Sequence, residues 1–335
     1  MQINRILAVT LILVCLLAAL VGGSRTLKAS PASPLAGGGL GRIAVVKVEG
    51  AIGQESSGFV SAGSLETRLL KLAKASDVKG VLLQINSPGG RVGTSQEIYR
   101  AILAIKAAQK PVVATMGDIA ASGGYYIASA ADKIFANPGS LTGSIGVILQ
   151  GLSFGELLEE YGIQPQTFKT GAYKDILSPY RLSTPAEKEL LQALIEDTLD
   201  QFVEDVSQGR QQIPSQADIL SEEMLTLRQQ MTPSRVRELA DGRVFTGRQA
   251  VTVGLVDAIG SYPEALADLR RLLKDDQEML SVGEEGAGVE SVIRRLLLSQ
   301  LSGSAGLGSP WAGGLWQEGR PEVSLLWLAP AWLTH

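Results

Sequence analysis

Short apolar runs alternate with amphipathic segments through most of the chain. The runs that indicate strands are 43–48, 78–85, 111–115, 133–136, 145–149 and 166–168. The segments with helical spacing or helix-start signals are 65–75, 95–109, 117–131, 157–161, 185–207 and 262–274, and 243–259 reads as a strand–turn–helix unit. This alternation predicts an α/β fold with parallel β-sheets and flanking helices.

One helix start is specified in detail by the sequence. Thr184 stands before the long amphipathic segment as an N-cap, and Glu187 follows three residues later, as in a capping box. The polar stretch 211–234 that follows shows no clear period. We therefore expect a long helix over 185–207 and a less regular segment after it.

The two ends of the chain differ in composition from the middle. Residues 6–21 form an apolar run near the lower length limit for crossing a bilayer, where about 20 residues are typical. We expect residues 1–23 to be a transmembrane signal anchor, with a cleaved signal peptide or a core helix as alternatives. Residues 24–41 read as a flexible linker, 42–283 as the folded domain and 284–335 as a tail of unknown role.

Histidine and cysteine are too rare in this chain to form several kinds of catalytic or metal site. The single histidine is His335, and the single cysteine, Cys15, lies inside the apolar run without the small residue that usually precedes a lipidated cysteine. These counts exclude Cys/His zinc sites and internal disulfides, and they argue against a His-dependent triad. A nucleophilic hydrolase would need Ser or Thr, with Lys, Asp, Glu or a terminal amine as base. We expect no metal or other cofactor.

Three glycine-containing segments follow or adjoin predicted strands, at 86–90, 121–126 and 141–146. Ligands bind at the carboxyl ends of parallel strands, and helix N-termini offer N–H groups that suit an oxyanion. Ser122 fits a nucleophile on such a helix start, and an ordinary N-cap serine is the alternative. Ser144 is a second candidate, with a turn serine as its alternative.

Lys174 is the candidate base, because the chain offers no suitably placed histidine. It lies in a loop before the long helix, beside Tyr173 and Ile176. An apolar, partly buried setting there would lower its pKa and leave neutral amine to accept a proton. A solvated surface lysine is the alternative.

Five motifs stand in an order that resembles the signal peptide peptidase A (SppA) family. They are Ser87-Pro88-Gly89-Gly90, Met116-Gly117 with Ala121-Ser122-Gly123-Gly124-Tyr125-Tyr126, Leu141-Thr142-Gly143-Ser144-Ile145-Gly146, Gly171-Ala172-Tyr173-Lys174-Asp175 and Asp241-Gly242-Arg243-Val244-Phe245-Thr246-Gly247. The resemblance runs from about residue 43 to 259. The stretch 211–234 is longer than usual for the family, and the tail carries no family motif.

The resemblance implies a Clp protease/crotonase-like fold and a role for each site residue. Ser122 would be the nucleophile and Lys174 the general base, with the Ser144 hydroxyl orienting the lysine amine. The N–H groups of Gly90 and Gly123 would form the oxyanion hole.

The resemblance also implies the setting of the reaction. Family members carry an N-terminal anchor with the catalytic domain outside the cytoplasm, and they degrade remnant signal peptides and other membrane-associated polypeptides. In single-copy members, serine and lysine come from neighbouring subunits of a homo-oligomeric ring. Two other functions remain open: a crotonase-like acyl-CoA enzyme, and a non-catalytic membrane scaffold that assembles into rings. The net charge of −4 gives no reason to expect nucleic acid as a partner.

Overall fold

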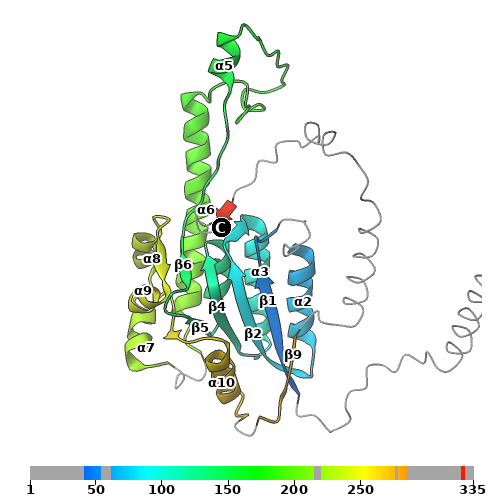
Figure 1. Ribbon diagram of the computed structural model, residues 1–335, viewed down its shortest axis with the longest axis vertical. Helices are drawn as coiled ribbons and strands as arrows, with labels where there is room; N and C mark the ends of the chain where they lie inside the picture. The colour runs from blue at the N-terminus through cyan, green and yellow to red at the C-terminus, as the bar shows by residue number, and fades with distance from the viewer. Residues whose placement is uncertain (1–40, 54–61, 215–219, 276–277, 285–325, 329–335) are drawn as a thin grey trace, which may run out of the picture. The chain divides into compact units, whose positions relative to one another are not determined.

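The computed structural model describes residues 41–53, 62–214, 220–275, 278–284 and 326–328 (Figure 1). The expected anchor over 1–23 lies outside the described residues, as does nearly all of the expected linker. Among the helices that the structure does describe, none combines the length and the apolar character that a bilayer span requires.

A parallel β-sheet with helices on both faces forms the centre of the fold. Its strands are β1 (Arg42–Glu49), β2 (Val78–Ser87), β4 (Val112–Ala121), β5 (Lys133–Ala136), β6 (Leu141–Gly143), β7 (Val244–Thr246), β8 (Ala258–Ile259) and β9 (Ser281–Glu284). The order is β7-β6-β4-β2-β1-β9, with β5 beside β4 and β8 beside β5. All pairs are parallel except β6 with β7. The expected parallel α/β architecture is confirmed.

Alternate side chains of the central strands enter two separate hydrophobic cores. Val46 and Leu83 face the core that includes α2 (Ala62–Lys74), α3 (Val92–Ala107) and α4 (Gly123–Ser129). Val45 and Leu82 face the other core, which α10 (Tyr262–Leu272) covers. Because both faces are covered, these strands read as continuous apolar runs in the sequence.

The strand β4 extends further than the sequence pattern indicates. A helix was expected from residue 117, but residues 117–121 continue the strand. The second half of β4 pairs with β6, Ala121 opposite Gly143, while the first half pairs with β5. The Ile119 N–H also donates to the Asn86 side chain at 3.2 Å. This long-range pairing stabilises extended backbone where the local sequence favours a helix.

Three further sequence expectations need correction. The strand in this part of the chain is β6, which ends at Gly143, so residues 145–149 form no strand, and neither do residues 166–168. The stretch 211–234 is more regular than expected: it holds α7 (Glu222–Gln229) and the start of α8 (Pro233–Leu239). The Ser221 and Thr232 hydroxyls cap these two short helices.

The long helix α6 (Pro185–Gln211) starts where the capping signal placed it. The Glu187 N–H donates to Thr184 Oγ1 at 3.2 Å, and the Thr184 N–H donates to the Glu187 carboxylate at 2.8 Å. The N-terminal half of α6 extends beyond the sheet, with α5 (Gly155–Glu160) past its end (Figure 1). The segment between α5 and α6, which includes Lys174, is thus held at the far end of a helix whose other end packs in the core.

A buried charge cluster attaches the C-terminal half of α6 to the sheet. Asp257, just before β8, accepts from Arg210 of α6 at 2.6 Å and from Arg228 of α7 at 2.8 Å. All three side chains are fully buried. Burial alone would raise the pKa of Asp257, but the two guanidinium groups more than offset it and hold this pKa well below its usual range.

A second, two-stranded sheet lies beside the main one. It pairs β3 (Gly89–Arg91) antiparallel with β10 (Leu326–Leu328), from the C-terminal tail. On the other edge of β3, Ile52 forms a parallel bridge with Gly90. The strand β3 therefore has a partner on each edge, β10 on one and Ile52 on the other.

Candidate active site

Ser122 connects β4 to α4 in an unusual backbone conformation. Its φ of 53° and ψ of −119° lie in a region that costs a residue with a side chain about 1–3 kcal/mol. Its N–H donates to the Gly143 carbonyl at 2.7 Å. Although Ser122 holds the N-cap position of α4, its hydroxyl caps nothing. The N-cap alternative for this serine is therefore wrong.

The Ser122 hydroxyl is buried without a hydrogen-bond partner. The residue has no exposed surface, and its Oγ contacts no donor or acceptor among the described residues. Leaving a buried polar group unpaired costs about 1–3 kcal/mol. An unpaired hydroxyl on strained backbone is a feature that needs a functional explanation.

Gly90 lies close to Gly123, the residue that follows Ser122 in the chain. A Cβ at Gly123 would sit 3.2 Å from the Gly90 backbone nitrogen and 2.6 Å from Ser95 Oγ. A Cβ at Gly90 would sit 2.0 Å from the carbonyl oxygen of Ile52. Only glycine therefore fits at position 90, and a side chain at 123 would require Ser95 and Gly90 to shift. The two N–H groups expected to bind an oxyanion come from adjoining segments.

Ser144 directly follows β6, the strand that pairs with the end of β4 before Ser122. Ala121 and Gly143 are opposite each other in the β4–β6 pair, so each serine follows the same rung of the sheet. Ser144 is buried, with a φ of 50°, and its N–H donates to the Arg243 carbonyl at 2.8 Å. The structure thus places Ser122 and Ser144 just past the ends of two paired strands, with Gly123 next to Ser122 in the chain and Gly90 close to Gly123.

Lys174 is not part of this group within a single chain. It lies in an exposed turn, where its N–H donates to the Gly171 carbonyl at 3.2 Å. Because Ser122 Oγ has no partner among the described residues, the Lys174 amine does not reach it from the same chain. The expected partly buried setting of Lys174 is wrong for one chain taken alone.

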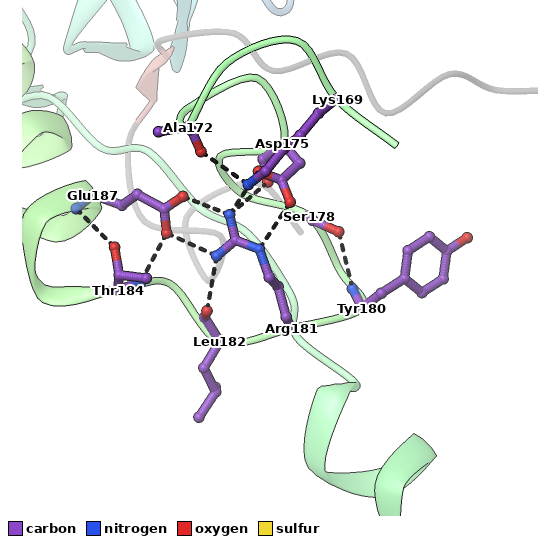
Figure 2. Close-up of polar contacts among 9 residues, drawn as sticks. All are labelled: Lys169, Ala172, Asp175, Ser178, Tyr180, Arg181, Leu182, Thr184 and Glu187. Atoms are coloured by element: carbon purple, nitrogen blue, oxygen red, sulfur yellow. Dashed lines mark hydrogen bonds and ion pairs between the residues drawn. The ribbon is translucent and has the colours of Figure 1, made fainter. Parts of the chain in front are cut away.

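A network of charged side chains holds the Lys174 turn (Figure 2). Arg181 donates to both oxygens of the Asp175 carboxylate, at 2.8 and 2.9 Å, and to both oxygens of Glu187, at 2.5 and 2.8 Å. Lys169 donates to Asp175 at 2.6 Å. Since Glu187 belongs to the capping box of α6, the network ties the turn to the first residues of that helix. We call Asp175, Arg181 and Glu187 the clamp.

The clamp carboxylates have lowered pKa values. Hydrogen bonds from Arg181 and then from Lys169 hold the pKa of Asp175 well below its usual range. Hydrogen bonds, first from Arg181 and then from the Thr184 backbone, lower the pKa of Glu187 to about 2. Both carboxylates are therefore ionised at neutral pH. The clamp was not predicted from the sequence, although Asp175 belongs to one of the five motifs and Glu187 to the predicted capping box.

The segment that carries Lys174 exposes many large apolar side chains. Phe168 is the extreme, with 93% of its surface exposed. The others are Ile148, Leu152, Phe154, Leu157, Tyr161, Ile163, Tyr173, Tyr180, Leu182, Leu190 and Leu194. An exposed apolar surface of this extent is typical of a protein–protein or membrane contact.

Comparison with known proteins identifies the family. The model of Peptidase family S49 matches residues 104–230 and 223–275, and the Clp protease model matches 47–142. A protein named as a protease in Synechocystis is 41% identical over 213 residues, which cover 63% of this chain and 70% of that protein. The chain belongs to peptidase family S49.

Two further relatives carry peptidase names. A protein of Enterococcus faecium named for signal peptide peptidase SppA is 40% identical over 61% of this chain and 54% of its own length. Protease 4 of Salmonella typhi is 32% identical over 79% of this chain and 39% of its own length. The chain thus spans about half or less of these two relatives. Together with the S49 match, they confirm the resemblance stated above and support a serine peptidase.

Proposed function

We propose that this S49 chain is a membrane-anchored serine endopeptidase that uses a Ser122–Lys174 dyad. The observation that carries the proposal is the buried, unpaired Ser122 hydroxyl on strained backbone, with Gly90 close to the adjoining Gly123. Ser122 Oγ attacks the peptide carbonyl carbon and forms an acyl-enzyme. The Gly90 and Gly123 N–H groups stabilise the oxyanion, which is worth about 3–4 kcal/mol for one such donor.

A second copy of the chain completes the site in this proposal. Lys174 is exposed and out of reach of Ser122 in its own chain, and the segment around it presents apolar side chains. A neighbouring copy in a ring would cover those side chains and bring its own Lys174 amine to this Ser122. Ser144, one strand away, would orient the amine. Lys174 takes the serine proton during the attack and gives it to the leaving amine nitrogen as the peptide C–N bond breaks. It later accepts a proton from the water that releases the acyl group.

The substrates we propose are remnant signal peptides and other membrane-associated polypeptides. The names of the relatives support this, as does the apolar run over 6–21, which would hold the domain at the outer face of a membrane. Short peptides released into a bilayer are unfolded and apolar, so they suit a site that takes extended chains.

Covalent labelling tests the nucleophile. A fluorophosphonate probe should modify the full-length chain at Ser122, as mapped by mass spectrometry of the labelled peptide. Ser122→Ala should abolish labelling and peptide hydrolysis, whereas Ser144→Ala should weaken hydrolysis less completely. Labelling at Ser144 that persists in Ser122→Ala would reverse the two roles.

Subunit mixing tests the shared dyad. Ser122→Ala and Lys174→Ala oligomers should each be inactive, and oligomers assembled from both should regain part of the activity. Hydrolysis by the unmodified chain should rise from neutral toward alkaline pH, because the base must be uncharged. No recovery on mixing would place both groups of each dyad in one chain.

A further inference from the structure

Every N–H group of the Arg181 guanidinium has an acceptor in the clamp or next to it (Figure 2). Nε and Nη2 donate to the Asp175 carboxylate at 2.9 and 2.8 Å, and Nη1 and Nη2 donate to the Glu187 carboxylate at 2.8 and 2.5 Å. Nη1 also donates to the Leu182 carbonyl at 3.1 Å, and Nη2 to the Asp175 carbonyl at 3.4 Å. The planar fork of an arginine can bind two carboxylates in this way, which the single ammonium group of a lysine cannot. Arg181 therefore fixes Asp175 and Glu187 relative to each other.

The turn that carries Lys174 depends on polar contacts within one chain. All residues from 161 to 186, each of them described, keep part of their surface exposed, and none belongs to a helix or strand until α6 begins at Pro185. Burial of apolar surface, the main favourable contribution to folding, is therefore weaker here than in the core. The position of the Lys174 turn in one chain is thus set mainly by hydrogen bonds and ion pairs.

The backbone close to Lys174 has the geometry of a turn that its surroundings hold in place. Leu177 has a φ of 63°, a left-handed conformation that residues with a side chain rarely adopt. Such backbone persists where surrounding contacts over-determine it. Two of these contacts meet at Asp175: the Ser178 N–H donates to its carbonyl at 2.9 Å, and the Lys169 amine donates to its carboxylate at 2.6 Å. The turn is therefore held at the residue next to Lys174.

We propose that Arg181 is a positioning residue for Lys174, which it holds in a fixed place relative to α6. Lys174 immediately precedes Asp175, one of the two carboxylate residues that Arg181 binds. The other, Glu187, also completes the capping box of α6, so the clamp joins the turn directly to the helix start. The opposite end of α6 is fixed to the sheet by the buried charge cluster around Asp257. This inference rests on the proposed function, because it concerns the proposed base.

The clamp has the properties of an ion-pair network that restrains its members. Isolated surface pairs contribute little, but bidentate arginine pairs joined in a network are an exception. The side chain of Arg181 is 31% exposed, that of Asp175 13% and that of Glu187 3%, so water screens this network less than a surface pair. Misplacing a catalytic group by about 1 Å can cost about 100-fold in rate. Loss of Arg181 should therefore act on kcat, whereas loss of a group that only binds substrate would act on KM.

Replacing Arg181 tests the positioning role against a matched surface arginine. Arg237 also binds two carboxylates of α6, those of Glu196 and Asp200, at 3.2 and 2.8 Å. Arg181→Met should lower kcat about 10- to 100-fold with little change in KM. Arg181→Lys should recover part of this loss, because lysine keeps the charge but not the fork. Arg237→Met should lose little, and an equal loss in Arg237→Met would refute a specific role for Arg181.

A double substitution tests whether the clamp acts as one unit. Glu187→Gln preserves the capping box, in which glutamine also serves, and removes the charge that Arg181 binds. Because both substitutions break the same contact, the double variant should have the kcat of Arg181→Met within about twofold. If the two losses multiply in the double variant, Arg181 and Glu187 act separately and the clamp does not position the turn.

Subunit mixing separates positioning from a general role in assembly. In oligomers mixed from Ser122→Ala and Lys174→Ala chains, the first chain supplies the lysine and the second supplies the serine. Arg181→Met should lower the regained activity about 10- to 100-fold more when it is in the lysine-supplying chain than when it is in the serine-supplying chain. Equal losses from the two chains would refute the positioning role and indicate a role in assembly.

Hydrogen exchange provides a readout that does not depend on activity. Backbone amides of residues 170–178 should exchange faster in Arg181→Met than in Arg237→Met. Unchanged exchange would refute the clamp, and faster exchange with an unchanged kcat would refute the positioning role. Full activity of Lys174→Ala would refute the proposed base and, with it, any positioning of that base. An inactive Lys174→Ala beside a fully active Arg181→Met would refute the positioning alone and leave the proposed function intact.

Discussion

Adding a methyl group at Gly209 should destabilise the protein, although alanine is the better helix former. Gly209 is a buried residue of α6, and a Cβ there would lie 2.2 Å from the Ser129 carbonyl oxygen at the end of α4. Ordinary contacts of this kind begin near 3.4 Å, so the two helices must move apart. Helix propensity alone would stabilise Gly209→Ala by about 1 kcal/mol. Overpacking costs about 1–3 kcal/mol, and the backbone contact places this site at the upper end.

The expected net loss is about 2 kcal/mol of unfolding free energy, the balance of these two effects. For a chain of this size that corresponds to a drop of about 3–4 °C in Tm. Gly93 of α3 is the matched control, because a Cβ there meets nothing within 4 Å. Gly93→Ala should be neutral or stabilising by up to about 1 kcal/mol.

The assay is thermal and urea unfolding of the full-length chain in detergent, followed by circular dichroism in a Ser122→Ala background. The decisive result is whether Gly209→Ala lowers the unfolding free energy while Gly93→Ala leaves it unchanged or raises it. If Gly209→Ala raises the stability as Gly93→Ala does, the close approach of α6 to the end of α4 is wrong. This contact joins the helix that follows Ser122 to the helix that follows the Lys174 turn, so it connects the supports of the two proposed catalytic residues.

Three other predictions concern charge, pH and the glycine strand. Asp257→Asn should lower the unfolding free energy, measured by urea titration, by about 3–5 kcal/mol, because it leaves two buried guanidinium groups without a counter-charge. Asp241 is exposed, so Asp241→Asn should change the unfolding free energy little. The lowered pKa of Glu187 means that its stabilisation is present above about pH 4.5 and is lost as the pH falls toward 2. The Tm difference between the parent and Glu187→Gln should therefore shrink over this range, and a constant difference would contradict it. Gly90→Ala, with its Cβ 2.0 Å from a backbone oxygen, should lose fluorophosphonate labelling, and Gly139→Ala, which meets nothing within 4 Å, should keep it.

The sequence by itself determined the features that depend on local pattern. The expected strands over 43–48, 78–85 and 133–136 are present as β1, β2 and β5, because both faces of the sheet are covered and these runs are continuously apolar. The start of α6 follows from Thr184 and Glu187, since a capping box uses only neighbouring residues. The order of the glycine motifs predicted the family that the comparisons then showed.

The tertiary structure decided the features that depend on residues far apart in the chain. Strand β4 continues to Ala121 because β6 pairs with it, and that pairing cannot be read from residues 117–121 themselves. The strained backbone and unpaired hydroxyl of Ser122 are visible only once β4, β6 and α4 meet. The pairing of β10 with β3 joins residues more than 200 positions apart, and backbone pairing of this kind leaves little trace in side-chain pattern. Local sequence therefore specified the elements whose pattern is continuous or capped by near neighbours, and only packing between distant elements decided how far β4 extends and which segments meet at the site.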